Sequence, residues 1–323
     1  MPEQHTTGVE LSVVIVNHDG ADCLPRALAA LAANTATESV ECLVVDSGSS
    51  DGSWEDVEHG WAKARALRFE ENIGFCAGCD RGAEAAVGRL VAFVNFDGEV
   101  EPDWDLPLVR LLDDPSVSVA TGLLLAPDGT IEAAGLDIAP NTATFARQGL
   151  MPRSAAPGEP LDVAAATGAL MMVRRSEFLS LGGFYEPIFM YGEETDYCLR
   201  VPGRIVFHPE SAIRHEHGHA AGPPRSAIRL YWGSRNRLVN AARHLPAATL
   251  AKSVLASAAF DLLTLFQQRD GKAARAVARG WWDGVRAMPR ERRARPAEER
   301  RRAARRLVSL RAAIAEQRRL GRI

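Results

Sequence analysis

Four short apolar segments in the first hundred residues are each followed by a polar loop that contains glycine. The segments are LSVVIV (11–16), VECLVV (40–45), ALRFE (66–70) and LVAFVNF (90–96), with helix-like stretches between them. Strands that alternate with helices indicate βαβ units, and hence an open, Rossmann-like parallel sheet with helices on both faces. Continuous apolar runs suit strands that are buried on both faces. The sequence therefore predicts the α/β class.

The four polar loops are expected to meet at one edge of this sheet. They read NHDG (17–20), DSGSSDG (46–52), ENIG (71–74) and NFDG (95–98). One such loop is ordinary turn chemistry. Ligands of open parallel sheets collect at the carboxyl ends of the strands, so four loops that follow four strands predict a shared crevice.

The other elements are read from local patterns. Helices are expected over CLPRALAALAAN, SWEDVEHGWAKA and FCAGCDRGAEAAVG, and another begins at Ser176. Residues 141–160 are rich in small residues and proline, and are expected to form a mobile loop. RIVFHP (204–209) reads as one more strand, and the chain reads as helical beyond Pro246.

Charge is distributed unevenly along the chain. From Arg269 to the end there are 18 Lys or Arg and 6 Asp or Glu, a net of +12, so the first 268 residues carry −15 of the total of −3. An acidic body is a poor ligand for a phosphate backbone, which argues against nucleic acid as a partner. The polar start predicts no signal segment, and five irregularly spaced cysteines suit bystander thiols in a reducing cytoplasm.

The C-terminal helical region has two features that bear on membranes. The segment 248–268 is apolar but contains Lys252 and Asp261, so an amphipathic or buried helix is favoured over a membrane span. The last segment is basic, with one narrow apolar stripe: Ala304, Leu307, Leu310 and Ile314. A basic amphipathic helix can lie on anionic lipid, and this interpretation is slightly favoured over a solvated helix packed on its own protein.

Two clusters could bind a metal ion. Asn95 and Asp97 end an apolar strand, and a carboxylate there can hold a hard divalent cation that neutralises a diphosphate. Four histidines follow within a short span: His208, His215, His217 and His219. A zinc site would require two cysteine pairs or an HExxH helix; Cys76 and Cys79 form a lone CxxC without a second pair, and the histidines follow a predicted strand rather than lying on a helix. A single imidazole beside a carboxylate around Mn²⁺ or Mg²⁺ is simpler, with His215 as the candidate.

A crowded group of carboxylates lies in FMYGEETDYCLRV (189–201). Glu193, Glu194 and Asp196 fall within four positions, and Arg200 follows. Such a group suits either a solvated helix start or a site of proton transfer.

Six segments in order give the chain a family resemblance. It resembles the inverting family-2 glycosyltransferases of the GT-A fold, in particular the rhamnosyltransferase-like branch, over roughly residues 10–240. The segments that carry the resemblance are VVIVNHDG, VVDSGSSDGS, ENIGFCAGCDRG, FVNFDGEVEPDW, TGALMMVRRSEFLSLGGFYEPIFMYGEETDYCLR and HPESAIRHEHG. The resemblance implies a GT-A catalytic domain over 1–245, with a nucleotide-sugar half (10–115) and an acceptor half (116–245), and a basic helical extension over 246–323.

The resemblance also implies roles for the loop residues. Nucleotide contacts fall on Asn17 and Asp46, and the nucleotide-pocket segment on Asn72, Gly74 and Gly78. The metal-binding DxD motif is Asn95-Phe96-Asp97 here, so its first carboxylate is missing, and Asp97 and His215 would be the metal ligands. Two further departures from the family are Cys76, where Ala is common, and Asp80, where Asn is usual.

The catalytic base of the resembling family falls on the pair Glu193 and Glu194. Glutamate replaces the usual aspartate at the base position, which leaves both residues open, with Glu194 favoured. Asp196 and Arg200 are counted among the candidate substrate-binding residues, and Asp196 is further expected to orient its neighbours or to pair with Arg200. The implied activity is transfer of a sugar, with rhamnose as a candidate, from a dTDP- or UDP-activated donor to a surface polysaccharide or a lipid-linked glycan. The expected place is the cytoplasm, with peripheral membrane contact through 246–323 as a further expectation.

Two rival functions fit the sequence less well than sugar transfer. A nucleotidyltransferase or sugar-phosphate enzyme on a related scaffold would need a basic, glycine-rich phosphate loop near the first strand, and NHDGADC has neither Lys nor Arg. A non-catalytic binding protein would not need the carboxylate cluster together with metal-ligand candidates. Both rivals are less favoured than the transferase.

Overall fold

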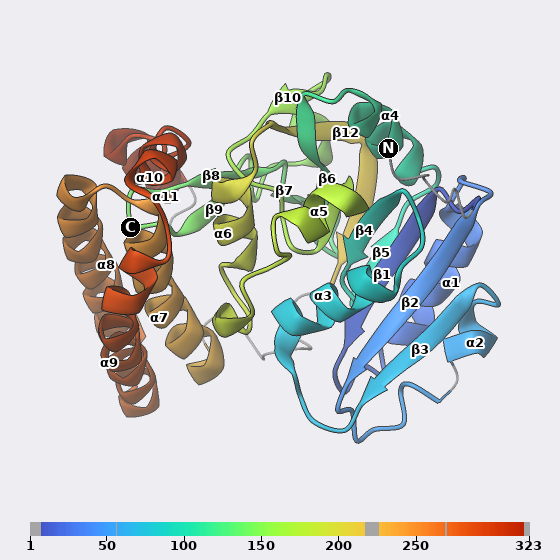
Figure 1. The fold of residues 1–323 in the computed structure, drawn as a ribbon, viewed down its shortest axis with the longest axis horizontal. Coiled ribbons are helices and arrows are strands. Elements are labelled where there is room, and N and C mark those ends of the chain that lie inside the picture. The colour runs from blue at the N-terminus through green and yellow to red at the C-terminus, as the bar shows by residue number, and fades with distance from the viewer. Residues whose placement is uncertain (1–7, 56, 217–225, 269, 320–323) are drawn as a thin grey trace.

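The structure is a computed structural model that describes residues 8–55, 57–216, 226–268 and 270–319. A large sheet is covered by helices on both faces, and a layer of C-terminal helices stands beside it (Figure 1). The first part contains β1 (Leu11–Asn17), α1 (Leu24–Asn34), β2 (Val40–Ser47), α2 (Val57–Gly60), β3 (Ala64–Phe69), α3 (Gly74–Ala85), β4 (Leu90–Val94), β5 (Gly98–Val100) and α4 (Asp105–Asp113).

The middle of the chain completes the sheet, and the end of the chain is helical. The middle contains β6 (Val117–Leu125), β7 (Ile131–Ala133), β8 (Leu136–Ile138), β9 (Thr144–Ala146), β10 (Leu161–Asp162), β11 (Leu170–Arg174), α5 (Arg175–Ser180), α6 (Glu193–Arg200) and β12 (Arg204–His215). Two 3₁₀ turns lie at Arg153–Ala155 and Glu186–Ile188. The C-terminal helices are α7 (Ala227–His244), α8 (Ala247–Gln268), α9 (Gly271–Arg293), α10 (Ala297–Ala304) and α11 (Leu310–Arg319).

The large sheet is mostly parallel. Its strands lie in the order β10-β12-β6-β11-β4-β1-β2-β3, with β5 on β12 and β7 on β6. The strands β1 to β4 run parallel to one another, as does β12 beside β6, whereas β11 is antiparallel to both β4 and β6. The α/β class predicted from the apolar runs is confirmed.

Burial on both faces explains why the strands are apolar throughout. In β1, Val14 and Val16 join one core cluster, which α3 also lines, while Val13 and Ile15 join a second cluster lined by α1. Alternate side chains of a strand point to opposite faces, so a strand between two helix layers needs apolar residues at every position. All five cysteines are buried and unbridged, as expected of bystander thiols.

Three predicted elements differ from the structure. The helix expected over 53–64 is reduced to α2, and Trp54 before it stacks under the guanidinium of Arg68 instead. The expected loop at 141–160 contains β9, which pairs with β8 to form a hairpin. The strand read at 204–209 continues to His215, because Ala212 and Ile213 also pair with β6.

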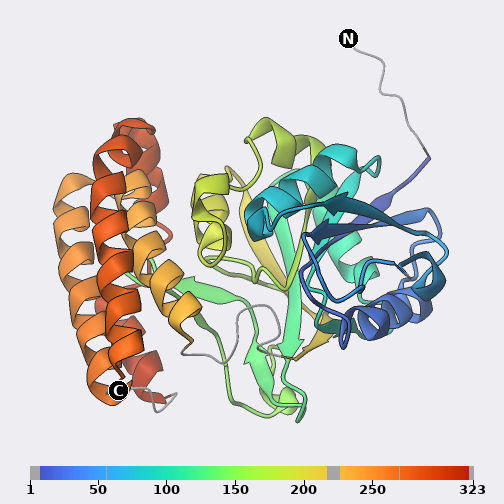
Figure 2. The same ribbon diagram turned by 90° about the horizontal axis from the view of Figure 1, so that it is seen from below.

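The C-terminal helices form a layer of their own. Helix α7 packs along α9, and α8 lies beside both (Figure 2). The predicted boundary at 245/246 falls between α7 and α8. Among the described residues one helix, Ala247–Gln267, is long and apolar enough to cross a membrane by length and composition, and only 17% of it is buried. The expectation of a buried helix is therefore wrong for α8, although its amphipathic character is present.

The last segment packs on its own protein. Ala303 is buried, Leu307 lies against the core, and the backbone N–H of Val308 donates to Ile138 O (3.0 Å). Arg306 donates to the carbonyl oxygen of Gly203 (2.7 Å). The favoured lipid-binding interpretation of the 304–314 stripe is therefore not supported at its first half, where a protein contact occupies the stripe. The side chains of Leu310 and Ile314 lie outside the described residues.

Candidate active site

Asn17 and Asp46 lie side by side at the carboxyl ends of β1 and β2, where the strands pair in register. Asn17 Nδ2 donates to Asp46 Oδ1 (3.0 Å) and to the hydroxyls of Ser49 (3.1 Å) and Ser53 (2.7 Å). Both Asn17 and Asp46 are fully buried, and Asn17 Oδ1 is an acceptor without a hydrogen-bond partner in the described part of the chain. The pair joins the first two loops at the end of the sheet.

The start of α3 forms the next wall of this region. Asn72 Oδ1 accepts hydrogen bonds from Ser47 Oγ (3.2 Å) and from the backbone N–H of Gly74 (2.9 Å). Gly74 has φ +82°, and a Cβ there would lie 2.5 Å from the ring of Phe189. A Cβ on Gly78 would lie 2.7 Å from Val16. Both glycines allow α3 to approach its neighbours closely, which a larger residue would prevent.

Asp97 and His215 come together from distant parts of the sequence. Asp97 follows β4, and His215 is the last residue of β12, paired with Gly98. His215 Nε2 lies 3.1 Å from Asp97 Oδ1 and 3.1 Å from Asn95 Nδ2. The backbone N–H of Asn95 donates to Ala169 O (3.2 Å), which fixes this loop against the start of β11. Both Asp97 and His215 are buried.

A second carboxylate, not anticipated from the sequence, stands behind His215. Glu132 of β7 lies with Oε2 3.1 Å from His215 Nδ1. Burial lowers the pKa of His215, but hydrogen bonds and charge from Asp97 and Glu132 outweigh it and raise that pKa to about 10. The electrostatics of this position therefore favour a positive charge. No motif marks Glu132 in the sequence, since the short hairpin that carries it has no distinctive pattern.

The donors at this position fit a divalent cation completed by a substrate. Asp97 offers a carboxylate oxygen and His215 an imidazole nitrogen, a mixture that Mn²⁺ accepts and Mg²⁺ tolerates. Glu132 stands where carboxylates commonly orient a ligating imidazole through its other nitrogen. Among the described residues, no three His, Cys, Asp or Glu side chains are arranged to hold one metal ion together. Phosphate oxygens or water would therefore supply the remaining ligands. His217 and His219 lie outside the described residues.

Glu193 and Glu194 begin α6 with different surroundings. Glu194 accepts from the backbone N–H of Gly192 (3.1 Å) and from the hydroxyls of Thr144 (3.3 Å) and Thr195 (3.4 Å). Glu193 Oε2 is buried and has no partner in the described chain. Glu194 therefore faces the β9 hairpin, while Glu193 lies beside Gly168, whose added Cβ would lie 3.2 Å from Glu193 Oε1.

These surroundings separate the acidities of the two glutamates. Burial, followed by the charge of Glu194, raises the pKa of Glu193 well above its usual value. Burial also raises the pKa of Glu194, but its hydrogen-bond donors oppose the shift. Of two adjacent buried carboxyl groups, the one with more donors holds the negative charge more readily. The arrangement therefore favours a protonated Glu193 beside an ionised Glu194.

The glutamate pair and the Asp97 region lie in one neighbourhood. Gly168, beside Glu193, precedes Ala169, whose carbonyl oxygen binds the backbone N–H of Asn95. The phenol of Tyr191 is partly buried, which raises its pKa; the charge of Arg229 lowers that pKa, and the charges of Glu193 and Asp97 both raise it. The start of α6 therefore lies close to the strand-end loops, where the sequence predicts a shared crevice.

The segment that enters α6 is held in a strained conformation by α7. Phe189 and Tyr191 have positive φ of 66° and 64°, which is uncommon for residues other than glycine. Asn236 Nδ2 donates to the carbonyl oxygens of Ile188 (3.0 Å), Met190 (2.9 Å) and Tyr191 (2.9 Å). No sequence pattern indicates that Asn236 holds this segment, because the contact joins parts of the chain about 45 residues apart.

Asp196 and Arg200 belong to a buried ion network below the glutamates. Asp196 accepts from Arg200 Nε (2.7 Å), Arg243 Nε (2.9 Å) and His244 Nε2 (2.7 Å). Arg243 also pairs with Glu291 of α9 (2.9 Å). Burial raises the pKa of Asp196, but these cations outweigh burial and hold it well below its usual range. The expected Asp196–Arg200 pair is present, and every recorded partner of both residues is a protein group.

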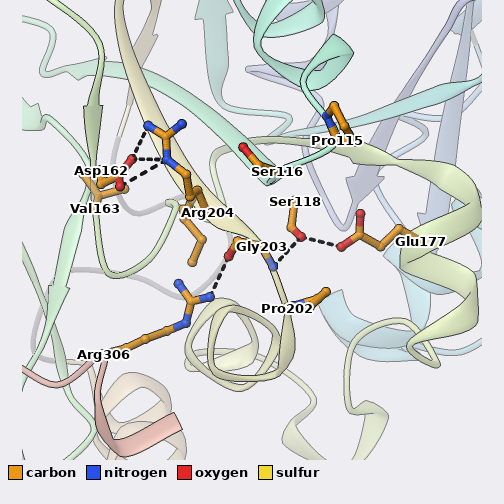
Figure 3. A pocket seen from close by; sticks show the side chains of 11 residues that line it. Pro115, Ser116, Ser118, Asp162, Val163, Glu177, Pro202, Gly203, Arg204 and Arg306 are labelled. Carbon is orange, nitrogen blue, oxygen red and sulfur yellow. Dashed lines mark hydrogen bonds and ion pairs between the residues drawn. The ribbon is translucent and has the colours of Figure 1, made fainter. Parts of the chain in front are cut away.

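A separate pocket lies at the opposite edge of the sheet. It is lined by Ser116 and Ser118 of the β6 start, by Arg204 at the β12 start and by Glu177 and Arg306 (Figure 3). Its arginines bind within the protein, Arg204 to Asp162 (2.7 Å) and Arg306 to Gly203 O (2.7 Å). Because β6 and β12 are parallel, their starts lie away from the carboxyl ends that carry Asp46 and His215. The pocket is therefore distinct from the crevice.

Comparison with known protein sequences gives matches along most of the chain. The sequence model described as Glycosyl transferase family 2 matches residues 12–177. The chain is 27% identical over 229 residues to the O-antigen biosynthesis protein RfbC of Myxococcus xanthus, covering 64% of this chain and 18% of that protein. It is 26% identical to the N-acetylglucosaminyl-diphospho-decaprenol L-rhamnosyltransferase of Mycobacterium tuberculosis, covering 66% and 78%. The chain spans 26% and 18% of the first two curated relatives it matches.

Solved structures share the fold. GalNAc-T7, crystallised with UDP, GalNAc and Mn²⁺, has 19% identity and a TM-score of 0.59 over 74% of this chain and 48% of that one. TarS 1–349 of S. aureus has 16% identity and a TM-score of 0.58 over 87% and 81%. These are GT-A glycosyltransferase structures, so the expected GT-A fold is confirmed.

Proposed function

The chain belongs to glycosyl transferase family 2, and we propose that it transfers a sugar, with inversion, from a nucleoside-diphosphate donor to a hydroxyl group of a glycan or lipid-linked acceptor. One observation carries the proposal. The Glu193–Glu194 pair at the start of α6 lies in one neighbourhood with the Asp97–His215 pair, linked through Gly168 and Ala169, and we propose that the two pairs line one crevice. Such a crevice combines a carboxylate that can take a proton with a site for a cation beside a diphosphate.

The nucleoside is assigned to the end of the crevice formed by the first three loops. Asn17 and Asp46 are joined by a hydrogen bond, and Asn72 ties the third loop to Ser47. Acceptor oxygens at the end of the second strand suit a ribose hydroxyl or the imide N–H of uracil or thymine. We therefore favour a UDP or dTDP donor, the nucleotides that the motif resemblance implies.

Asp97 and His215 are the residues that would hold Mn²⁺ or Mg²⁺, and Glu132 would orient the imidazole. The cation would stabilise the negative charge that grows on the leaving diphosphate. The missing first carboxylate of the DxD motif is filled by Asn95, whose amide lies against His215. A neutral amide leaves the site with less negative charge, so tight binding would depend on the diphosphate.

Glu194 is assigned as the general base. It faces the β9 hairpin of the acceptor half, and its hydrogen-bond donors keep it the more acidic of the pair. It would take the proton of the acceptor hydroxyl while that oxygen bonds to the anomeric carbon and the bond to the diphosphate breaks. Proton transfer of this kind contributes about 10²–10⁴-fold to the rate. Glu193, protonated, is assigned to hydrogen-bond with the sugar or the acceptor.

Asp196 and Arg200 are assigned a positioning role, in place of the substrate contact expected from the sequence. Both are buried and engaged with protein groups, so they support α6 from below. Gly74 and Gly78 act likewise by close packing of α3.

The names of the relatives suggest the class of acceptor. The Mycobacterium tuberculosis relative is named for transfer of L-rhamnose to a diphospho-decaprenol-linked sugar, and RfbC is named for O-antigen biosynthesis. We propose a lipid-linked glycan or growing surface polysaccharide as the acceptor, and rhamnose as one candidate sugar. Such a reaction would take place in the cytoplasm at the inner face of the membrane.

The test is hydrolysis and transfer across a panel of nucleotide sugars, with and without Mn²⁺, followed by mass spectrometry of the products. The proposal expects metal-dependent release of one nucleoside diphosphate, with a UDP- or dTDP-sugar preferred. If the protein binds these donors but does not cleave them with any metal or lipid-linked acceptor, the proposal is wrong and the protein is a non-catalytic binding protein.

A further inference from the structure

A row of large apolar side chains lies on the outer surface of α8. Leu255, Leu262 and Phe266 are 71%, 68% and 71% exposed, and Leu263 is 38% exposed. Spacings of seven and four residues place the first three on one side of the helix. Large apolar side chains scattered singly over a surface are ordinary, but a continuous row of them marks a surface that meets another body.

Helix α9 extends the same surface. Trp282 is 64% exposed and Val285 is 49% exposed. Trp281 Nε1 donates to Asp261 Oδ2 (2.7 Å), so this pair marks where α9 and α8 touch. The residues that follow the pair are Trp282 and Leu262. A short link makes the two helices antiparallel. In two antiparallel helices that touch, the residues that follow the two contact residues point to the same side of the pair, so Leu262 and Trp282 lie on one surface. We name Leu255, Leu262, Leu263, Phe266, Trp282 and Val285 the outer face.

Basic side chains border the outer face along α9. They recur at helical spacing and are all exposed: Lys272, Arg275, Arg279, Arg286, Arg290 and Arg293. Arg286 lies over the ring of Trp282 (5.4 Å), so the basic row and the apolar row adjoin. Acidic groups are sparse there, with Asp283 beside Arg279 and the buried Glu291 beside Arg290. The combination of apolar and basic rows is typical of helices that lie on anionic lipid.

A hollow at this border adds a place for an anionic group. It has a volume of about 430 Å³ and lies between α7 and α9. Three arginines and two aromatic residues surround it, with Asp283 at its edge: Arg235, Arg286, Arg290, Tyr231 and Trp232. Arginine binds phosphate oxygens readily, and aromatic rings favour the boundary between lipid and water.

Two other occupants of the outer face fit less well. If α8 crossed a membrane, Asp261 would leave its ion pair with Arg237 and its bond with Trp281, which costs several kilocalories in hydrocarbon. If a second copy of the chain covered the face about a twofold axis, two rows of arginines would oppose each other. An anionic lipid surface satisfies both rows at once.

We propose that α8 and α9 lie flat on an anionic membrane surface, with the outer face among the lipid chains and the basic row at the phosphate groups. This proposal goes beyond the transfer reaction and does not depend on it. It narrows the expected membrane contact from residues 246–323 as a whole to α8 and α9. Asn236 and Asn240 of α7 bind the segment before α6, so the docked layer would hold the crevice at a fixed distance from the lipid.

The test is flotation of the full-length protein with vesicles of phosphatidylcholine alone and of equal parts phosphatidylcholine and phosphatidylglycerol. Wild-type protein is expected to float only with the anionic vesicles. Leu262→Glu and Phe266→Glu should each lower the fraction bound by about tenfold, since each removes an apolar group and adds a negative charge. Arg275→Gln with Arg279→Gln should weaken binding several-fold and reduce its sensitivity to salt.

Controls separate this proposal from its alternatives. Leu150 is 67% exposed and lies outside α8 and α9, so Leu150→Glu should bind vesicles like the wild type. Thermal unfolding of each variant checks that the exposed substitutions leave the fold intact. Equal binding to neutral vesicles, no binding to either, resistance to alkaline carbonate extraction, or a dimer that Leu262→Glu dissociates would each overturn the proposal.

Discussion

The buried carboxyl group of Asp80 lowers the free energy of unfolding and is not among the residues proposed for catalysis or binding. It lies on α3, only 7% exposed, and accepts a hydrogen bond from the backbone N–H of Phe184 (2.8 Å). Burial raises its pKa to about 7. The folded protein therefore binds a proton at this site that the unfolded chain, near its usual value of 3.8, has already lost. This term makes the folded state less stable as pH rises from about 4 to about 7.

Asp80→Asn is predicted to stabilise the protein, and more so at pH 8 than at pH 5. Asparagine keeps the oxygen that accepts from Phe184 and carries no charge to bury. The gain at pH 8 should be at least about 1 kcal/mol in the free energy of unfolding. Urea denaturation of both proteins at the two pH values measures it. An equal effect at both pH values would show that the charge of Asp80 is not the cause.

The proposed cation site also depends on a single residue that no motif reveals. Asp97 and His215 could be chosen from the sequence because Asp97 follows an apolar strand and both residues match family motifs. Glu132 could not, because its role depends on a three-residue strand that reaches His215 only in the folded sheet. Local patterns report which residues end strands, and not which distant side chain stands behind them.

Glu132→Gln is predicted to lower the affinity for Mn²⁺ by about 10–100-fold in the presence of a nucleoside diphosphate. The amide would keep the size of the side chain and lose the charge that favours a cation beside His215. Calorimetric titration with Mn²⁺ measures this directly, without turnover. Glu84→Gln, which removes an exposed partner of Arg81 on α3, is the control and should leave the metal affinity unchanged.

At the scale of elements, strands and long helices were predictable, whereas short elements were not. The strands β1, β2 and β4 are apolar throughout because they pack against helices on both faces, a strong local signal. Helix α2 and the β8–β9 hairpin depend on contacts such as the stacking of Arg68 on Trp54. The segment before α6 is equally non-local, since α7 holds its positive-φ residues in place.

Asn236→Ala is predicted to lower turnover about tenfold or more, with a smaller effect on donor affinity. Without three hydrogen bonds to the segment at 188–191, its strained residues can relax, and α6 would shift the glutamates from their working positions. Steady-state kinetics separates turnover from apparent affinity. Ser234 is also buried on α7 but makes no hydrogen bond to this segment, so Ser234→Ala should retain normal turnover. Unchanged kinetics in Asn236→Ala would contradict the positioning role.

At the scale of the whole molecule, the C-terminal helices are part of the support of the crevice. Arg243 of α7 joins Asp196 of α6 to Glu291 of α9, and its guanidinium stacks on Tyr185 (3.5 Å). The sequence showed a basic excess beyond residue 268, but not that Arg243 of α7, which precedes that region, neutralises a buried aspartate. The amino-acid composition gives the net charge of a region, but only the packed structure shows which charged groups are buried.

Arg243→Met is predicted to destabilise the protein by about 3–5 kcal/mol, because it leaves Asp196 and Glu291 buried with fewer partners. The free energy of unfolding from urea titration measures the loss. Arg279→Met, on the exposed side of α9, should change it by less than about 0.5 kcal/mol. If both substitutions had the same small effect, the network would not couple the C-terminal helices to α6.

The account as a whole depends on proton removal by Glu194 in a crevice that already holds the donor. The measurement that tests this most directly is turnover of Glu194→Gln beside Glu193→Gln, with donor affinity determined for both by calorimetry. We predict that Glu194→Gln binds the donor within a few-fold of the wild type and loses about 10²–10⁴-fold in turnover, while Glu193→Gln loses far less. Near-normal turnover in Glu194→Gln would contradict the account.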